Sequence, residues 1–424
     1  MNTIDPRYAN YFAILKEELV AAMGCTEPAA IAFAAARARE ELGALPERVT
    51  LIVSGNIIKN VRSVVVPHTG GLHGIKAAVA AGVIAGNSAK KLEVIDGVTS
   101  AEQPKIKQFL DNIPISLEMS SSENVLEIDI TVYKGSSKVR VLIIGSHTNI
   151  SRIEKDGVCT FQGENLLEHV ETDRSLLSVE GILDYAETVD INEVRPLIER
   201  QIEYNSAISA EGLLSNWGAN IGSVLLTESS DNPQVRARAA AAAGSDARMS
   251  GCELPVIILS GSGNQGMTAS LPVIEYAKTL QSDHETLIRA LVLSSLITIH
   301  LKTGIGRLSA YCGVVSAGAA AGAGIAYLHG GRFEEIAHTI VNALAITSGI
   351  VCDGAKPSCA AKIASAVDAG ILGYKMFKNG QQFYGGEGLV ARGLEETIAN
   401  ISRLGRVGMQ LTDKEIINIM LHDE

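Results

Sequence analysis

Residues 316–326 read SAGAAAGAGIA, and residues 237–243 read ARAAAAA. Alanine is the strongest helix former, and faces made of small side chains let two helices approach closely. Beyond residue 190 this composition continues, and the alternation of apolar and polar residues that marks strands nearly disappears. Aromatic residues make up only 4% of the chain, as expected where closely packed helices leave little room for large rings. The sequence therefore predicts a large Ala/Gly-rich helical domain over residues 191–424.

The middle of the chain has a different pattern, with a period of two. Apolar and polar residues alternate along 126–132 (LEIDITV) and, after the turn KGSS at 134–137, again along 139–143 (VRVLI), which predicts a β-hairpin. Residues 49–54 form another predicted strand, and the Ala/Gly-rich residues 72–85 a helix. We therefore predict an α+β fold. A mixed α/β domain (46–190) is inserted between an N-terminal helical segment (1–45), which joins the helical domain, and residues 191–424.

The charge balance excludes some classes of partner. The 424 residues include 36 basic and 47 acidic ones, for a net charge of −11, whereas nucleic-acid binding needs a concentrated basic face. Mean hydropathy is high at +0.19, but no uninterrupted apolar run reaches the roughly 18 residues of a membrane span. The N-terminal residues lack the basic and apolar regions of a signal peptide. We therefore expect a cytoplasmic protein that binds neither nucleic acid nor membrane.

Six cysteines in a reducing compartment are packing residues, metal ligands or catalytic groups rather than a disulfide framework. Cys312 begins the small-residue helix, and Cys352 and Cys359 follow it. Residues 353–354 (DG) are predicted to end the helix that carries Cys352, and residues 357–358 (PS) to begin the next one, so that both sulfurs face one point. Three thiolates there suit an iron–sulfur cubane, a zinc site without histidine, or core packing. The spacing alone does not choose among these.

Cys25 lies in the element GCTEP at residues 24–28, which indicates a helix start because Pro28 suits the first turn. A thiol at a helix N-terminus tends towards the thiolate, so Cys25 is a candidate nucleophile, base or ligand. Buried packing is the alternative. Cys159, in strand-like sequence, and Cys252 have no recognisable partner, and we predict both to be packing residues.

A glycine-rich turn supplies candidate ligand-binding groups. Residues 260–268 (SGSGNQGMT) follow the apolar run VIIL and open a helix, so their backbone N–H groups suit a phosphate or a carboxylate. A loop made for packing is the alternative, and the segment matches neither the P-loop nor the dinucleotide fingerprint. Asn264 and Gln265 favour ligand contact, because their amides can reach both a carboxylate and an amine.

Three weaker clusters accompany this turn. Residues 145–149 (GSHTN) end a strand, Lys59 and Asn60 precede the turn HTGG at 68–71, and residues 245–248 (SDAR) place opposed charges beside the same helical region. A lone histidine such as His147 is more often an ordinary hydrogen-bonding residue than a base. Together the clusters offer amide, hydroxyl, ammonium and guanidinium groups suited to a small zwitterionic or carboxylate ligand.

These blocks resemble the L-cysteine desulfidase family, which is related to the iron–sulfur L-serine dehydratases. The resemblance runs essentially end to end. It depends on GCTEP (24–28), HTNI (147–150), SDARM (245–249), residues 260–268, LSA (308–310) and VCDGA (351–355) with Cys359. It implies that Cys312, Cys352 and Cys359 hold a 4Fe–4S cluster, lost in part or whole on aerobic purification, and that Cys25 is the catalytic base.

The resemblance also implies the reaction. L-Cysteine would undergo β-elimination to pyruvate, ammonia and hydrogen sulfide, with the open iron as a Lewis acid and Glu27, Lys59 or His147 as the general acid. Elimination from L-serine, a pyridoxal-phosphate lyase and a non-catalytic cluster-based sensor are the alternatives. A homodimer is compatible with the apolar helical domain. The expected substrate-binding residues are Thr26, Glu27, Asn60, His147, Asn149, Ser262, Asn264 and Gln265.

Overall fold

The computed structural model describes residues 5–122, 124–163, 172–306 and 309–422, so Leu308 of the LSA block lies outside the described residues. Its larger sheet has the strand order β3-β2-β4-β5-β6-β7. β2 and β3 are parallel, and the other neighbouring strands are antiparallel. The predicted hairpin is confirmed, with Lys134 of β4 opposite Ser137 of β5. The strands span Arg48–Val53 (β2), Ile115–Met119 (β3), Glu127–Lys134 (β4), Ser137–Ile144 (β5), Ile150–Lys155 (β6) and Val158–Gln162 (β7).

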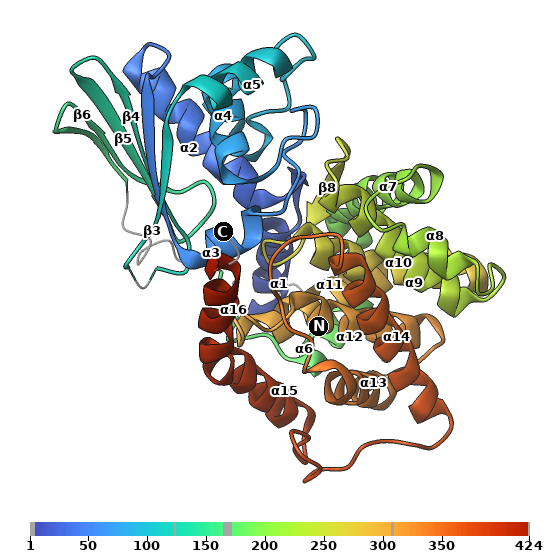
Figure 1. Cartoon of the computed structure of the whole chain (residues 1–424). Coiled ribbons are helices and arrows are strands. Elements are labelled where there is room, and N and C mark those ends of the chain that lie inside the picture. Colours follow the sequence, from blue (N-terminus) through green and yellow to red (C-terminus); the bar gives the residue numbers. More distant parts are fainter. Residues whose placement is uncertain (1–4, 123, 164–171, 307–308, 423–424) are drawn as a thin grey trace.

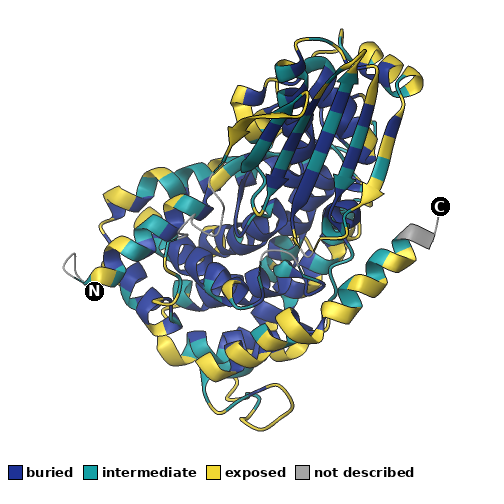
Figure 2. Ribbon diagram, turned by 90° about the vertical axis from the view of Figure 1, so that its left-hand side faces the viewer, coloured by how far each residue is buried: buried dark blue, intermediate teal, exposed yellow. Residues whose placement is uncertain are grey.

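Helices lie on one side of this sheet (Figure 1). They are α2 (Thr26–Leu42), α4 (Gly74–Ala85), the 3-10 helix η1 (Ser88–Glu93) and α5 (Gln103–Asn112). Helix α2 packs directly on β4 and β5, and α4 packs on α2. The strands alternate between buried residues and more exposed ones, as Figure 2 shows. The strand predicted at 49–54 and the helix predicted at 72–85 are both confirmed, with small shifts at their ends.

The helical domain is built around α12, which packs against α10, α11, α13 and α14. Its residues 314–326 are all buried, so the close packing predicted from small side chains is confirmed. The helices span Pro6–Glu18 (α1), Val179–Thr188 (α6), Ile191–Leu214 (α7), Ile221–Leu226 (α8), Pro233–Met249 (α9), Gly263–Leu280 (α10), His284–Thr303 (α11), Gly313–Leu328 (α12), Phe333–Thr347 (α13), Cys359–Lys378 (α14), Leu394–Arg403 (α15) and Gln410–His422 (α16). A π-helical turn, η2 (Leu404–Gly408), joins α15 to α16.

The described residues form two large hydrophobic cores and two small clusters. With its helices and its six-stranded sheet, this is an α+β protein. The helical core takes in buried residues between 8 and 22 and between 177 and 198 as well as those of the later helices. The sheet core takes in residues 30–42 of α2 together with α4 and the strands. The first 45 residues are therefore shared between the cores, since α1 belongs to one and most of α2 to the other. Helix α3 (Gly55–Val61) follows β2 directly at the end of the sheet that faces the helical domain (Figure 1).

Helix α11 passes a test of length and composition for crossing a membrane, the one helix among the described residues that does so. Inside this chain, 72% of its most apolar window is buried. A helix buried by its own domain has little apolar surface left for lipid. We therefore interpret α11 as a core helix of the helical domain.

Three local expectations are wrong. A short strand, β1 (Val20–Met23), pairs with β8 (Pro255–Ile258), although neither segment has the alternation that predicts strands. Helix α13 ends at Thr347, so Cys352 lies in an irregular segment beyond it rather than on the helix. Cys159 is exposed on the edge strand β7 and does not pack in a core, whereas the packing role predicted for Cys252 is confirmed by its burial in the helical core.

Candidate active site

A cavity of about 600 Å³ lies where the two cores meet. Its lining combines residues of α2, α3 and the turn after β5 with residues of the helical domain. The predicted site residues on this lining are Cys25, Thr26, Glu27, Asn60, His147, Ser262, Asn264, Gln265, Cys312, Cys352 and Cys359. Asn149 does not line it; its side-chain amide instead donates to the Ile144 carbonyl at 3.1 Å and fastens the turn after β5.

Four helices begin at this cavity. The N-cap residues are Cys25 for α2, Ser262 for α10, Cys312 for α12 and Ser358 for α14, whose first residue is Cys359. None of the four N-caps makes a side-chain capping hydrogen bond. At α2 and α10 the first backbone N–H groups make no hydrogen bond with the described residues and are available to a ligand, whereas those of Cys359 and Ala360 in α14 donate to the Lys356 and Pro357 carbonyls at 3.0 and 3.2 Å. The helix dipole favours negative charge at all four starts. Four such ends at one cavity make it a place for anionic groups.

Cationic side chains reinforce this preference. Arg248, at the end of α9, is buried; its Nε donates to the Gly24 carbonyl at 3.0 Å and its Nη1 to Asn264 Oδ1 at 3.2 Å. The guanidinium therefore ties the start of α2 to the start of α10. Arg406, from η2, also lines the cavity.

The pair of opposed charges expected at residues 245–248 does not form. The Asp246 carboxylate accepts from the Gly222 backbone N–H at 3.0 Å, while Arg248 faces the cavity. Burial raises the pKa of Asp246 to about 6, although the backbone N–H groups around Gly222 act in the opposite direction. Asp246 is therefore a helix-capping residue of α8, outside the cavity.

Two buried lysines complete the positive charge. Lys302, in the last turn of α11, has no hydrogen bond or ion pair with any residue the structure describes, and burial lowers its pKa to about 8. Lys59 of α3 forms an ion pair with Asp413 of α16. Sequence reasoning missed Lys302 and Arg406, because each stands alone in a helix with no motif around it. The one signal available in the sequence was the position of Lys302 at the end of an apolar helix.

The three cysteines predicted as ligands come from two segments that pair. Tyr311 and Val351 form an isolated β-bridge. Beside it, the Cys312 N–H donates to the Ile350 carbonyl at 3.1 Å, and the Cys352 N–H to the Ala310 carbonyl at 2.6 Å. The start of α12 and the segment after α13 are thus fixed to each other, which sets two of the three sulfurs on one wall.

Glycine is required where this segment passes α3. Gly354 has φ of +94°, and a Cβ there would lie 2.0 Å from the Lys59 carbonyl oxygen. A side chain would collide with the backbone of α3, so only glycine allows this approach. The Cys352 sulfur accepts a hydrogen bond from the Cys312 thiol and lies near Lys59 and Lys302, and these contacts lower the pKa of Cys352.

Cys25 differs from the sequence-based expectation. Its position as N-cap of α2 is confirmed, but complete burial raises its pKa to about 12, with only Arg248 acting strongly in the opposite direction. The prediction that the helix start favours a Cys25 thiolate is therefore wrong, because burial raises the pKa of this thiol. Met249 lies beside it, with the two sulfurs 4.0 Å apart.

Glu27 is the carboxylate of the cavity wall. Its Oε2 accepts from the Thr26 hydroxyl at 3.0 Å and its Oε1 from the Asn60 amide at 2.9 Å. Gln265 is also buried, and its Oε1 has no hydrogen-bond partner among the described residues. An unpaired buried acceptor is costly unless a ligand completes it. The cavity therefore offers acceptors for an ammonium group as well as donors for a carboxylate.

Comparison with known proteins identifies the family of this chain. The profile of the serine dehydratase alpha chain family matches residues 89–418. A UPF0597 protein of Desulfitobacterium hafniense is 62% identical over all of this chain and 99% of its own length. UPF0597 proteins of Lachnoclostridium phytofermentans and Finegoldia magna are 53% and 47% identical, over 98% and 97% of this chain and 100% and 99% of their own lengths. The chain therefore belongs to the serine dehydratase alpha chain family.

Proposed function

We propose that the protein is an L-cysteine desulfidase, which eliminates hydrogen sulfide from L-cysteine and releases pyruvate and ammonia. The observation that carries the proposal is the meeting of Cys312, Cys352 and Cys359 with four helix N-termini in one cavity. The proposal extends the family's lyase scaffold to a thiol leaving group. All six cysteines are free, as a reducing cytoplasm would keep them.

The donor set fits an iron–sulfur cluster better than a single ion. Among the described residues, no group of three His, Cys, Asp or Glu side chains is placed to hold one metal ion. A cluster distributes its thiolate ligands over several irons, so they need not converge on one point. Lys302 is buried and has no ion-pair partner among the described residues, so its ammonium group would stabilise a negatively charged cluster beside it. Cys312, Cys352 and Cys359 would hold a 4Fe–4S cluster, which supplies Lewis acidity at an iron without a protein ligand.

The substrate would be held at both of its charged ends. Its carboxylate fits the start of α10, where the backbone N–H groups after Ser262 and the side chains of Arg248 and Asn264 are available. Its ammonium fits the Glu27 carboxylate and the unpaired Oε1 of Gln265. These contacts place the α-carbon near the start of α2, where Cys25 is the N-cap.

Cys25 would then take the α-proton at its sulfur, while the C–S bond at the β-carbon breaks and hydrosulfide leaves. The remaining aminoacrylate tautomerises and is hydrolysed to pyruvate and ammonia. Burial favours the protonated Cys25 thiol, so its thiolate needs more positive charge than Arg248 alone supplies. The ammonium of the bound substrate brings such a charge, so the thiol would lose its proton after binding. That proton would pass to the group that later protonates the leaving hydrosulfide. The proton for the leaving group would come from Glu27, Lys59 or His147.

L-Serine is the second candidate substrate, and the match to serine dehydratase alpha chains favours it. Anaerobic reconstitution followed by assays of pyruvate with each amino acid, and of sulfide with L-cysteine, tests both. We expect a higher kcat/KM for L-cysteine. Faster turnover of L-serine would reassign the substrate, and no turnover of either would leave the cluster-based sensor. A sharp violet absorption band in place of a broad shoulder would instead indicate a pyridoxal enzyme.

A further inference from the structure

A segment near the end of the described chain borders both the helical core and the cavity, with Met409 as its one residue buried in that core. Residues 404–417, which we call the C-terminal strap, comprise η2 and the first part of α16. Figure 1 shows α16 running from the helical domain towards α3, and Figure 2 shows its outer side exposed. Leu411 is 77% exposed, so the strap is a surface element with few buried side chains of its own.

The strap is attached at both ends. At its start, the Gly405 carbonyl accepts from the Ser309 hydroxyl at 2.8 Å, and Ser309 lines the cavity on the helical side. At its other end, Ile417 packs on α3 so closely that a Cβ on Gly55 would lie 2.8 Å from its Cδ1. The strap therefore joins the helical core to the sheet core beside the cavity.

Between these attachments lies the ion pair of Lys59 and Asp413. The Lys59 side chain is only 1% exposed and that of Asp413 18%. Among the described residues, Asp413 is the one hydrogen-bond and ion-pair partner of Lys59 Nζ. A buried ammonium needs a counter-charge, and the cavity beside Lys59 already holds Lys302 and Arg248. Asp413 is thus what keeps the Lys59 ammonium in the wall.

We propose that Asp413 is a positioning residue of the active site, which acts through Lys59, and that the C-terminal strap closes the cavity between the two cores. The Glu27 carboxylate in the same wall already accepts from Thr26 and Asn60. Without the Asp413 carboxylate, the Lys59 ammonium would therefore turn to the substrate carboxylate and draw it from the start of α10. The kinetic part of this inference depends on the proposed function, whereas the attachment of the strap does not.

The test compares Asp413→Asn with Glu415→Gln, which removes the same charge from an exposed site on the same helix. Using the reconstituted full-length protein and L-cysteine, we expect Asp413→Asn to lower kcat about tenfold, as loss of a supporting partner often does. Glu415→Gln should have no effect, and Asp413→Glu should restore most of the rate. In a Lys59→Met background, Asp413→Asn should cost nothing further, since its action runs through Lys59.

Hydrogen exchange of the protein without substrate tests the attachment itself. Backbone amides of residues 410–417 should exchange about tenfold faster in Asp413→Asn and in Lys59→Met, but not in Glu415→Gln. Equal exchange in all variants would contradict the attachment of the strap by the Lys59–Asp413 ion pair. Kinetic losses that multiply in the double variant would show that Asp413 does not act through Lys59. If the wild type turns over neither amino acid, the proposed function fails, and the exchange data still decide whether the pair holds the strap.

Discussion

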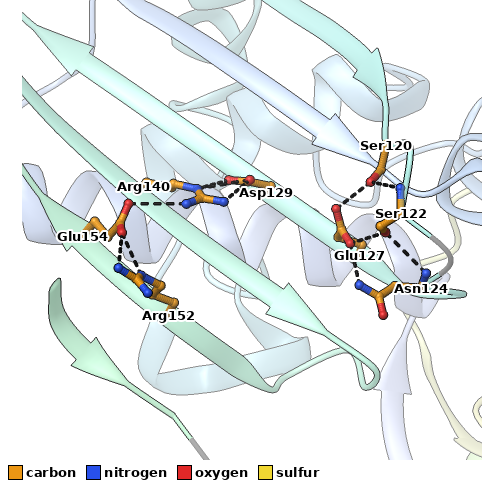
Figure 3. A network of polar contacts seen from close by, with 8 residues as sticks. All are labelled: Ser120, Ser122, Asn124, Glu127, Asp129, Arg140, Arg152 and Glu154. Carbon is orange, nitrogen blue, oxygen red and sulfur yellow. Dashed lines mark hydrogen bonds and ion pairs between the residues drawn. The ribbon is translucent and has the colours of Figure 1, made fainter. Parts of the chain in front are cut away.

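The outer face of the sheet and the central cavity are both rich in polar groups, but in the cavity some of the described groups lack a partner within the chain. On the sheet, Arg140 donates to both oxygens of Asp129 at 2.7–3.1 Å and to Glu154 at 3.4 Å (Figure 3). Arg152 completes the row with a 2.7 Å bond to Glu154. In the cavity, Lys302 has no ion-pair or hydrogen-bond partner among the described residues, and none of those residues donates a hydrogen bond to the Oε1 of Gln265.

This comparison distinguishes polar groups that stabilise the fold from polar groups that bind a ligand. Charges that are paired within the chain, as in this row, need no ligand and contribute modestly to folding. Buried groups that lack partners cost folding free energy, so their persistence in one cavity indicates a site that external groups complete. Four predictions test this distinction, in order of decreasing expected effect.

The largest effect concerns the sulfur wall. Cys352→Ser should abolish iron and sulfide binding after anaerobic reconstitution and lower turnover at least about 100-fold, because a serine hydroxyl is a poor ligand for iron in a cluster. Iron and acid-labile sulfide analysis measures this directly. The control is Cys252→Ser, which alters a cysteine buried in the helical core away from the cavity. Full iron content in Cys352→Ser would show that the three sulfurs do not form the cluster site.

The second effect separates binding from stability at one residue. Gln265→Met removes a buried acceptor without changing side-chain volume greatly, so the melting temperature should stay the same or rise. The KM for the amino-acid substrate should increase about tenfold, because the ammonium loses one acceptor.

The matched control is Gln201→Met. Gln201 is fully buried in the helical domain, and its Oε1 also lacks a partner among the described residues, but it does not line the cavity. KM should be unchanged there. If both variants raise KM equally, the unpaired oxygen of Gln265 is not a substrate contact.

Local signals predicted the parts of this site well. Glycine-rich turns, prolines and the onset of small-residue runs located the helix starts at Cys25, Ser262, Cys312 and Cys359, because a few neighbouring residues decide where a helix begins. The alternation along β4 and β5 likewise predicted the hairpin and its turn. These features depend on residues within a few positions of each other, so one sequence suffices to find them.

Local sequence signals could not predict the burial and the long-range contacts of the site residues. That Cys25 is fully buried, and so has a raised pKa rather than a lowered one, depends on packing by α9 and on the segment around Gly354. Arg248 donates to the carbonyl of Gly24, 224 positions away in the chain, rather than pairing with the nearby Asp246. Asp413 reaches Lys59 across 354 positions. Contacts at such separations follow from how the two cores meet, which no local pattern encodes.

The third prediction tests an unpaired group outside the cavity. The Oδ1 of Asp246 is buried without a partner among the described residues, and the pKa of Asp246 is raised from 3.8 to about 6. Folding therefore favours the protonated acid, so ionisation between about pH 4 and pH 7 costs stability. Over that range, the free energy of unfolding of the wild type should fall by about 1–2 kcal/mol relative to Asp246→Asn.

Urea unfolding at several pH values measures this trend, and Asp283→Asn gives the opposite sign. Asp283 caps α11 by accepting from the Thr286 N–H at 2.9 Å, which lowers its pKa. The wild type should therefore gain stability relative to Asp283→Asn as pH rises through the low-pH range. Parallel trends in the two variants would contradict the assignment of Asp246 as a carboxylate destabilised by burial.

The smallest effect belongs to the paired row on the sheet. Arg140→Met leaves Asp129 and Glu154 facing each other without the guanidinium between them, so the free energy of unfolding should fall by about 0.5–1 kcal/mol. Arg152→Met should cost less, because the Arg152 side chain is 42% exposed and pairs, among the described residues, with Glu154 alone. Both losses should shrink in 1 M salt, where the Debye length is about 3 Å. Turnover should be unchanged, since the row lies away from the cavity; a loss of turnover at unchanged stability would mean that the outer face also serves the site.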